Sequence, residues 1–213
     1  MELLAAGDSK SLERFTLWID AVGGYLVCSS PEVIFGQATS SPRADVAIVA
    51  DIAPKHFRII RTREVYLIEP LAEICIDGRP VREKTPLIHE QLIGLTGGVE
   101  LRFRKPHPLS MTATLEIETR QRTRPWSDGI LLMADSCLVG PSANDHVFCK
   151  HWGTELVFFR RGDELHVRCG CPYSVDGESR SGTSLLTLNS RLLGEDFSLS
   201  LESVAISGVS AQD

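Results

Sequence analysis

The sequence has no long apolar run and few aromatic residues. No stretch of its 213 residues approaches the roughly 20 apolar residues that a membrane-spanning helix needs. Met1–Lys10 carries no basic region ahead of an apolar segment, so it predicts no secretory signal peptide. We therefore expect a soluble, cytoplasmic protein that does not associate with membranes.

Cysteine is also too sparse for a disulfide scaffold. Six Cys are spread over a chain much longer than the small secreted domains that depend on disulfides, so we expect reduced and mostly buried thiols. The formal net charge of −6 gives no electrostatic reason to expect binding to nucleic acid. Hydrophobic residues make up 43% of the chain, which is ordinary for a protein with a packed core.

The chain lacks the short motifs that mark common catalytic and cofactor sites. It has no P-loop, no dinucleotide-binding glycine fingerprint and no Gly-x-Ser-x-Gly sequence. The run 177–182 is a Ser/Gly turn to which no His constellation can be attached. We therefore expect a protein that is not an enzyme and needs no cofactor.

What the sequence does contain is a succession of short apolar runs of strand length. In the first run, Phe15, Leu17 and Ile19 alternate with polar residues, which is the period of a half-buried strand. Turn formers such as Asp77-Gly78 and Gly97-Gly98 separate later runs and supply the positive φ of hairpin turns. Many short strands with regular turn signals predict an all-β protein made of antiparallel sandwiches.

The two halves of the sequence look like copies of one another. Ile74–Gly78 parallels Tyr173–Gly177, and Leu95–Phe103 parallels Leu193–Leu201. The polar, basic run Glu118–Pro125 lies between the halves and predicts a linker. The expected organisation is an N-terminal tail (1–13), a first sandwich (14–117), a linker (118–127), a second, shorter sandwich (128–206) and a C-terminal tail (207–213).

The first half resembles the forkhead-associated (FHA) family over roughly residues 15–106. It has an apolar strand, a break that contains Pro54, a His and an immediate return strand. The landmarks of that family are a Gly-Arg, a Ser-x-x-His and an Asn-Gly. They fall here on Gly36-Gln37, on Ala53-Pro54-Lys55-His56 and on Asp77-Gly78.

The FHA resemblance implies a β-sandwich whose loops at one end bind phosphothreonine peptides. It also implies structural roles for Gly36, His56 and Gly78, and in this family the His braces the loops. The second half resembles a further-eroded copy, with Gly140-Pro141, Asp176-Gly177 and no evident x-x-His.

The departures from the family pattern weaken the predicted phosphate site. Gln37 stands where Arg is expected, and loss of one charge-assisted hydrogen bond costs about 1–1.5 kcal/mol. Ala53 lacks the expected hydroxyl, which removes about 1 kcal/mol more. Asp77 replaces Asn and would repel an incoming phosphate.

Other polar side chains near the landmarks could rebuild an anion site. Hydroxyls and cations follow Gly36, and cations flank the other two landmarks. The candidate ligand-binding residues are Gln37, Ser40, Ser41, Arg43, Lys55, Asp77 and Arg79. The expected partner is a protein, either phosphorylated on threonine or acidic. Ordinary solvated loop charges, on a scaffold that has lost phosphate binding, are the alternative.

Two further patterns, a Cys/His set and a run of alternating arginines, each allow a functional interpretation. The set His146, Cys149, His151, Cys169 and Cys171 has enough N and S donors for tetrahedral zinc, although its spacing matches no standard zinc motif. Cys169 and Cys171 could equally share one face of a strand and point into a core. The alternating arginines at 120, 122 and 124 would face the same way in an extended segment, either as a solubilising face or as a docking strip for an acidic partner.

Overall fold

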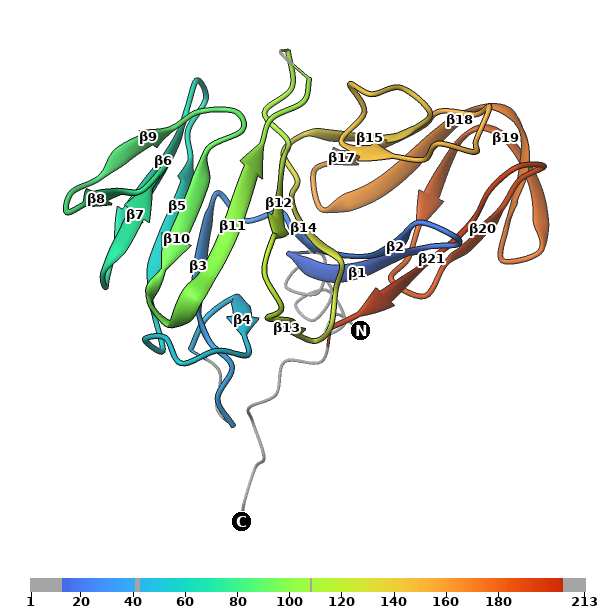
Figure 1. The fold of residues 1–213 in the computed structure, drawn as a ribbon. Coiled ribbons are helices and arrows are strands. Elements are labelled where there is room, and N and C mark those ends of the chain that lie inside the picture. Colours follow the sequence, from blue (N-terminus) through green and yellow to red (C-terminus); the bar gives the residue numbers. More distant parts are fainter. Residues whose placement is uncertain (1–12, 41–42, 108, 205–213) are drawn as a thin grey trace, which may run out of the picture. The chain divides into compact units, whose positions relative to one another are not determined.

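The computed structural model describes residues 13–40, 43–107 and 109–204, and it is built from strands (Figure 1). Within these ranges the one helical element is the 3-10 turn η1 (Thr96–Gly98). The predicted all-β sandwich class is therefore confirmed. No helix in this part of the chain has the length and apolar character needed to cross a membrane.

The strands follow one another with short connections. Those of the first half are β1 (Arg14–Ile19), β2 (Gly23–Cys28), β3 (Glu32–Gln37), β4 (Val46–Ile48), β5 (Phe57–Arg61), β6 (Tyr66–Pro70), β7 (Ile74–Ile76), β8 (Arg79–Val81), β9 (Thr85–Leu87), β10 (Leu92–Leu95) and β11 (Val99–Arg104). Those of the second half are β12 (Ala113–Ile117), β13 (Thr123–Arg124), β14 (Gly129–Leu132), β15 (Ser136–Gly140), β16 (Val147–Phe148), β17 (Leu156–Arg161), β18 (Glu164–Val175), β19 (Glu178–Leu186), β20 (Arg191–Leu193) and β21 (Ser198–Ser203).

The described chain divides into two compact units that interleave in sequence. Of the described residues, unit 1 holds 13–30, 104–115 and 127–203, whereas unit 2 holds 31–103, 116–126 and 204. This division differs from the expected consecutive sandwiches at 14–117 and 128–206. Each unit has its own apolar core.

Unit 2 is a sandwich of two sheets. One sheet has the strand order β13-β4-β3-β5-β6-β9, and the other contains β11-β10-β7-β8. Tyr66 of β6 and Phe103 of β11 meet edge to face with ring centroids 5.1 Å apart, so the two sheets share one core. The buried rings of Phe35 (β3) and Phe57 (β5) stack on each other, with centroids 4.5 Å apart.

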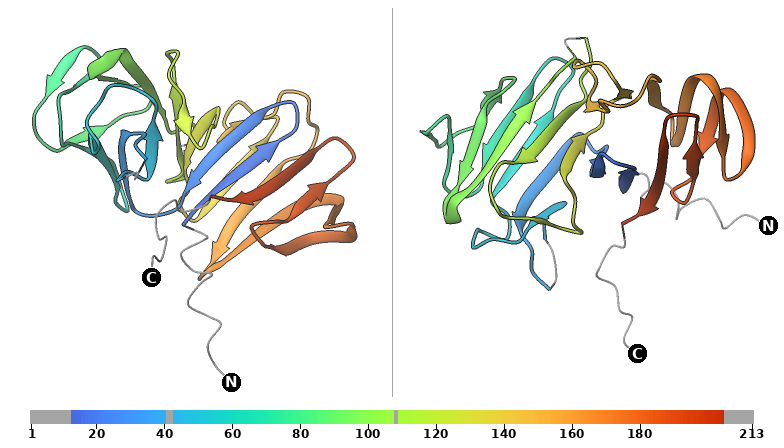
Figure 2. Two further views of the ribbon diagram at one scale, coloured as in Figure 1. Left: turned by 90° about the horizontal axis from the view of Figure 1, so that it is seen from below. Right: turned by 45° about the vertical axis from the view of Figure 1, so that its right-hand side comes forward.

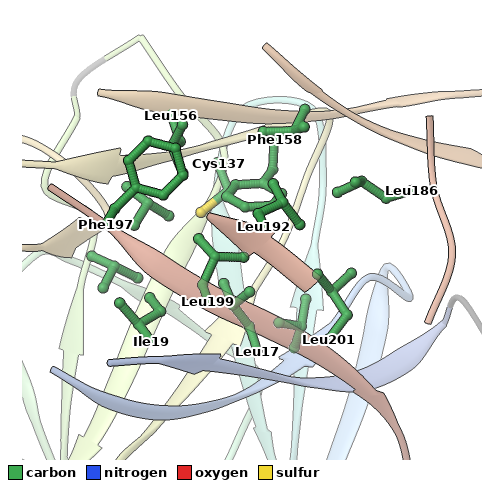
Figure 3. Packing of buried hydrophobic residues seen from close by; sticks show 14 of the residues in the cluster. Leu17, Ile19, Cys137, Leu156, Phe158, Leu186, Leu192, Phe197, Leu199 and Leu201 are labelled. Atoms are coloured by element: carbon green, nitrogen blue, oxygen red, sulfur yellow. The ribbon is translucent and has the colours of Figure 1, made fainter. Parts of the chain in front are cut away.

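Unit 1 has a second core to which strands from both ends of the chain contribute. Alternate residues of β1, β20 and β21 face alternate residues of β15, β17 and β18, which is why each strand shows a period-2 apolar pattern. Figure 3 shows ten labelled members of this cluster: Leu17, Ile19, Cys137, Leu156, Phe158, Leu186, Leu192, Phe197, Leu199 and Leu201.

The N-terminal hairpin β1–β2 belongs to unit 1 and not to the unit formed by the strands that follow it. β1 pairs antiparallel with β21, and β2 pairs in parallel with β14 (Figure 2). Phe15, Leu17 and Ile19 are no more than 3% exposed. The apolar period of β1 predicted that it needs a core, but the period does not say which strand will be its neighbour.

Two groups of three strands, one in each half of the chain, have the same pairings. β3 pairs in parallel with β4 and antiparallel with β5, and β15 does the same with β16 and β17. Both Asp-Gly turns have positive φ, which is 50° at Asp77 and 54° at Asp176. Asp77 Oδ1 accepts the Leu92 N–H at 3.0 Å, and Asp176 Oδ1 accepts the Arg191 N–H at 2.7 Å.

Candidate functional site

His56 braces one end of unit 2. The ring is 1% exposed, its Nδ1 accepts the N–H of Ala53 at 3.1 Å, and its Nε2 lies 2.9 Å from the carbonyl oxygen of Glu73. Because Nδ1 is the acceptor, the ring proton lies on Nε2 and is donated to Glu73. Burial lowers the pKa of His56, which favours this neutral form. The ring thereby ties the β4–β5 loop to the segment that enters β7.

The backbone of His56 makes further connections at the same end. Its N–H donates to Phe35, and its carbonyl accepts the N–H groups of Leu71 and Ala72 at 3.0 and 2.9 Å. We call the segments gathered here, residues 36–38, 49–56, 71–73 and 96–98, the loop end of unit 2. They come from both sheets of the sandwich, and the hydrogen bonds of His56 tie the β4–β5 loop to β3 and to residues 71–73.

Gly36 permits the closest approach within the loop end. A Cβ built on Gly36 would lie 2.1 Å from the carbonyl oxygen of Pro54, which is far inside the contact distance. The turn at Gly97 is similarly close, since its Cβ would lie 2.8 Å from the Asp51 carbonyl oxygen. The β4–β5 loop therefore lies directly against β3 and the β10–β11 turn.

Substitution of Gly36 tests this close approach. Gly36→Ala is expected to lower the free energy of unfolding by about 1–3 kcal/mol, because the loop backbone must move to admit the methyl group. Gly170→Ala is the matched control, since a Cβ there meets no atom within 4 Å. Urea titrations followed by circular dichroism measure both changes. Equal effects of the two substitutions would contradict the argument.

Gln37, predicted as a ligand-binding residue, donates its hydrogen bonds to the β4–β5 loop instead. Its backbone N–H donates to Ala53 at 3.0 Å, and its side-chain Nε2 donates to the Ala50 carbonyl at 3.1 Å. The amide carries no charge, so it cannot replace the fork of an Arg. In this structure Gln37 stabilises the β4–β5 loop.

Two of the three cations predicted for the site, Lys55 and Arg43, are exposed side chains of unit 2. Lys55 directly precedes His56, and Arg43 lies in the β3–β4 loop together with exposed Ser40. Among the described residues, Lys55 and Arg43 form no ion pair. Ser41, the other predicted hydroxyl, lies outside the described residues.

Asp77 and Arg79 do not lie with the other predicted site residues. Glu73, which His56 binds, precedes β7, whereas Asp77 follows it. Four extended residues span about 13 Å, so the β7–β8 turn is well removed from the loop end. Asp77 binds the Leu92 backbone there, and Gly78 takes the positive φ of the turn, 76°. The expected grouping of Asp77 and Arg79 with Lys55 is therefore corrected.

The predicted linker is a strap across unit 2. Glu118 donates its N–H to the carbonyl of Glu100 at the start of β11, and Arg122 accepts the N–H of Val49 at the end of β4. Residues 118–122 therefore pass from one sheet to the other beside the loop end, and β13 then pairs with β4. Thr123 is buried, whereas the alternating Arg122 and Arg124 are exposed, as their alternation predicted.

The Cys and His residues weighed for zinc do not form a metal site. Within the described ranges, no three His, Cys, Asp or Glu side chains are grouped so that they could hold a metal ion. Cys169 is buried but Cys171 is exposed, because a β-bulge between Cys169 and Tyr173 breaks the period of β18. The expectation that both thiols share one face is therefore corrected.

His146 is instead part of a buried polar cluster in unit 1. Its Nδ1 accepts the N–H of Leu138 at 2.9 Å, and the His107 ring lies 6.2 Å away between centroids. His146 Nε2 and His107 Nδ1 are both buried without a hydrogen-bond partner among the described residues. Burial lowers the pKa of His146 to about 4, and the neighbouring His107 acts in the same direction.

In unit 1, Glu155 occupies the position that corresponds to His56. Leu156 pairs with Val139 as Phe57 pairs with Phe35, so the residues before Leu156 and Phe57 correspond. No x-x-His was evident in the second half because this loop has a different length and carries an acid at this point. A carboxylate at this position would repel a phosphate.

A hollow of about 520 Å³ lies beside β19 in unit 1. Its charged side chains are already engaged: Arg180 contacts Glu178 at 2.5 Å, and Asp176 Oδ2 accepts the Ser190 hydroxyl at 3.2 Å. This hollow offers no uncommitted cation for a phosphate. The loop end of unit 2 is therefore the stronger candidate.

Two comparisons with known proteins identify no relative of this chain. A scan against protein-family models finds no match, and a search of curated proteins also finds none. The functional argument therefore depends on the residues of the loop end.

Proposed function

We propose that the protein is a non-catalytic interaction module of the FHA type, which captures a peptide phosphorylated on threonine at the loop end of unit 2. The observation that carries this proposal is the bracing by His56, which ties loops of both sheets together next to exposed Lys55. A rigid loop cluster beside a cation is what recognition of a short phosphorylated segment needs.

The donors for the phosphate would be Lys55, Arg43 and the hydroxyl of Ser40. Lys is a compact charge without the bidentate fork of Arg, so it contributes charge but less directional specificity. Gln37 and Ala53 supply neither charge nor hydroxyl to the ligand. The expected affinity is therefore about tenfold or more below that of a site with the full Arg and Ser set.

Peptide titration tests the proposal. Fluorescence anisotropy with phosphothreonine, phosphoserine and unmodified threonine peptide libraries is expected to show binding that requires the phosphate. Lys55→Ala is expected to weaken phosphothreonine binding about tenfold, through loss of a charge-assisted contact. Arg63→Ala, in the β5–β6 turn at the opposite end of β5, is the matched control.

Equal binding of all three libraries would reject phosphate recognition. It would then favour a second candidate function, a scaffold of FHA type that has lost its ligand site. The observations that favour this second role are the inward-directed amide of Gln37 and, for unit 1, Glu155 at the His56 position. In either case the partner is a protein, and unit 1 has a structural or docking role.

A further inference from the structure

The strap of unit 2 carries a row of cations into the loop end. Arg122 is hydrogen-bonded to Val49, the first residue of the β4–β5 loop that ends at Lys55 and His56. Arg124 follows two residues later on the same exposed face, opposite buried Thr123. Alternate residues of a strand lie about 7 Å apart, so the two guanidinium groups form a short row along the sheet edge.

This row is unusual in an acidic chain. Arg120, Arg122 and Arg124 are exposed, and among the described residues none of them forms an ion pair. Arg58 of β5 behaves differently, since it is half-buried and held by Glu32 and Glu69. The strap therefore presents uncompensated positive charge beside the loop end, although the whole chain has a net charge of −6.

We infer that the strap arginines bind an acidic segment of the same peptide whose phosphorylated residue occupies the loop end. This inference extends the proposed function, since it names the chemistry of the residues that flank the phosphothreonine. An extended peptide places every second side chain on one face at the same spacing of about 7 Å. Asp or Glu at alternate positions therefore matches Arg122 and Arg124, and Arg120 lies nearer the phosphate.

Charge also favours a short acidic peptide over a nucleic acid. A nucleic acid carries a continuous array of phosphates and would meet the repulsion of the net negative chain over a long distance. A segment with two or three carboxylates meets only the local field of the strap, which falls off within about 10 Å at ordinary ionic strength. The row is also too short to neutralise many phosphates.

Three peptides separate the strap from the phosphate site. The first carries phosphothreonine and alternating Glu, the second carries phosphothreonine and alternating Gln, and the third carries unmodified Thr and alternating Glu. In the full-length protein, Arg122→Gln with Arg124→Gln is expected to weaken binding of the first peptide about fivefold and leave the second unchanged. Raising the salt concentration is expected to reduce this difference.

The matched control is Arg63→Gln with Arg79→Gln, which removes the same charge from the β5–β6 turn and from the start of β8, away from the loop end. Thermal melts check that both double variants are folded. Equal losses for the Glu and Gln peptides, or competition by an oligonucleotide as strong as by the first peptide, would overturn the inference. If phosphate dependence is absent but the third peptide still binds through the strap arginines, the proposed phosphate site fails and the acidic docking row stands.

Discussion

Deletion of residues 1–30 is expected to unfold unit 1 of this protein, although most of that unit comes from the C-terminal half of the chain. The deletion removes β1, which pairs with β21 over five residue positions, and β2, which pairs with β14. It also removes Phe15, Leu17 and Ile19 from the core. Burial of three such side chains contributes about 5–9 kcal/mol, which is comparable to the whole stability of a domain.

The same reasoning predicts that the fragment 128–206 does not fold alone. Thermal melts followed by circular dichroism, together with amide exchange, are expected to show no cooperative transition for this fragment. A milder variant of the full chain, Leu17→Ala, is expected to lower the free energy of unfolding by about 2–5 kcal/mol. Leu193→Ala is its control, because Leu193 is 53% exposed. A cooperative melt of fragment 128–206 would contradict the assignment of β1–β2 to unit 1.

Acidification is expected to destabilise unit 1 through His146. Burial lowers the pKa of His146 from its ordinary value of 6.5 to about 4. Above pH 6.5 the ring is neutral in both the folded and the unfolded chain, so it has no effect. Between pH 6.5 and 4 only the unfolded chain takes up the proton, so stability falls as the pH falls. The complete loss is about 3 kcal/mol, since one pKa unit corresponds to about 1.4 kcal/mol.

The groups around His146 shape this response. The His107 ring lies 6.2 Å away between centroids, and its charge lowers the pKa of His146 further. Asp145 is also buried, and burial raises its pKa, so it offers little negative charge to compensate at low pH. Because Nδ1 of His146 accepts the Leu138 N–H, a second proton on the ring would go to Nδ1 and break that hydrogen bond.

Denaturant titrations at pH 7, 6, 5 and 4 measure the effect. His146→Gln is expected to lower stability at pH 7, because the Leu138 N–H loses its partner, and to flatten the decline between pH 6.5 and 4. His151→Gln is the control, since His151 is exposed. An unchanged slope in the His146 variant would show that other groups cause the acid sensitivity.

The candidate site was predicted in part from the sequence. The pattern around Pro54 and His56 indicated a loop braced by a His, and the hydrogen bonds of His56 agree with that role. The local sequence pattern could not show that Asp77 lies at the far end of β7 from this loop. That position depends on how β7 pairs with β10. The pattern also could not show that Gln37 turns its amide inward to Ala50.

The sequence by itself determined the fold class and the positions of several turns, because apolar alternation and Asp-Gly or Gly-Gly turns are local properties. It also indicated the repeated order of elements in the two halves. Only the tertiary structure decided that β1–β2 packs in unit 1 and that the basic run 118–122 is a strap across unit 2. The physical reason is that similar strands in two similar halves offer equivalent edges and faces, and the choice between them depends on packing over the whole chain.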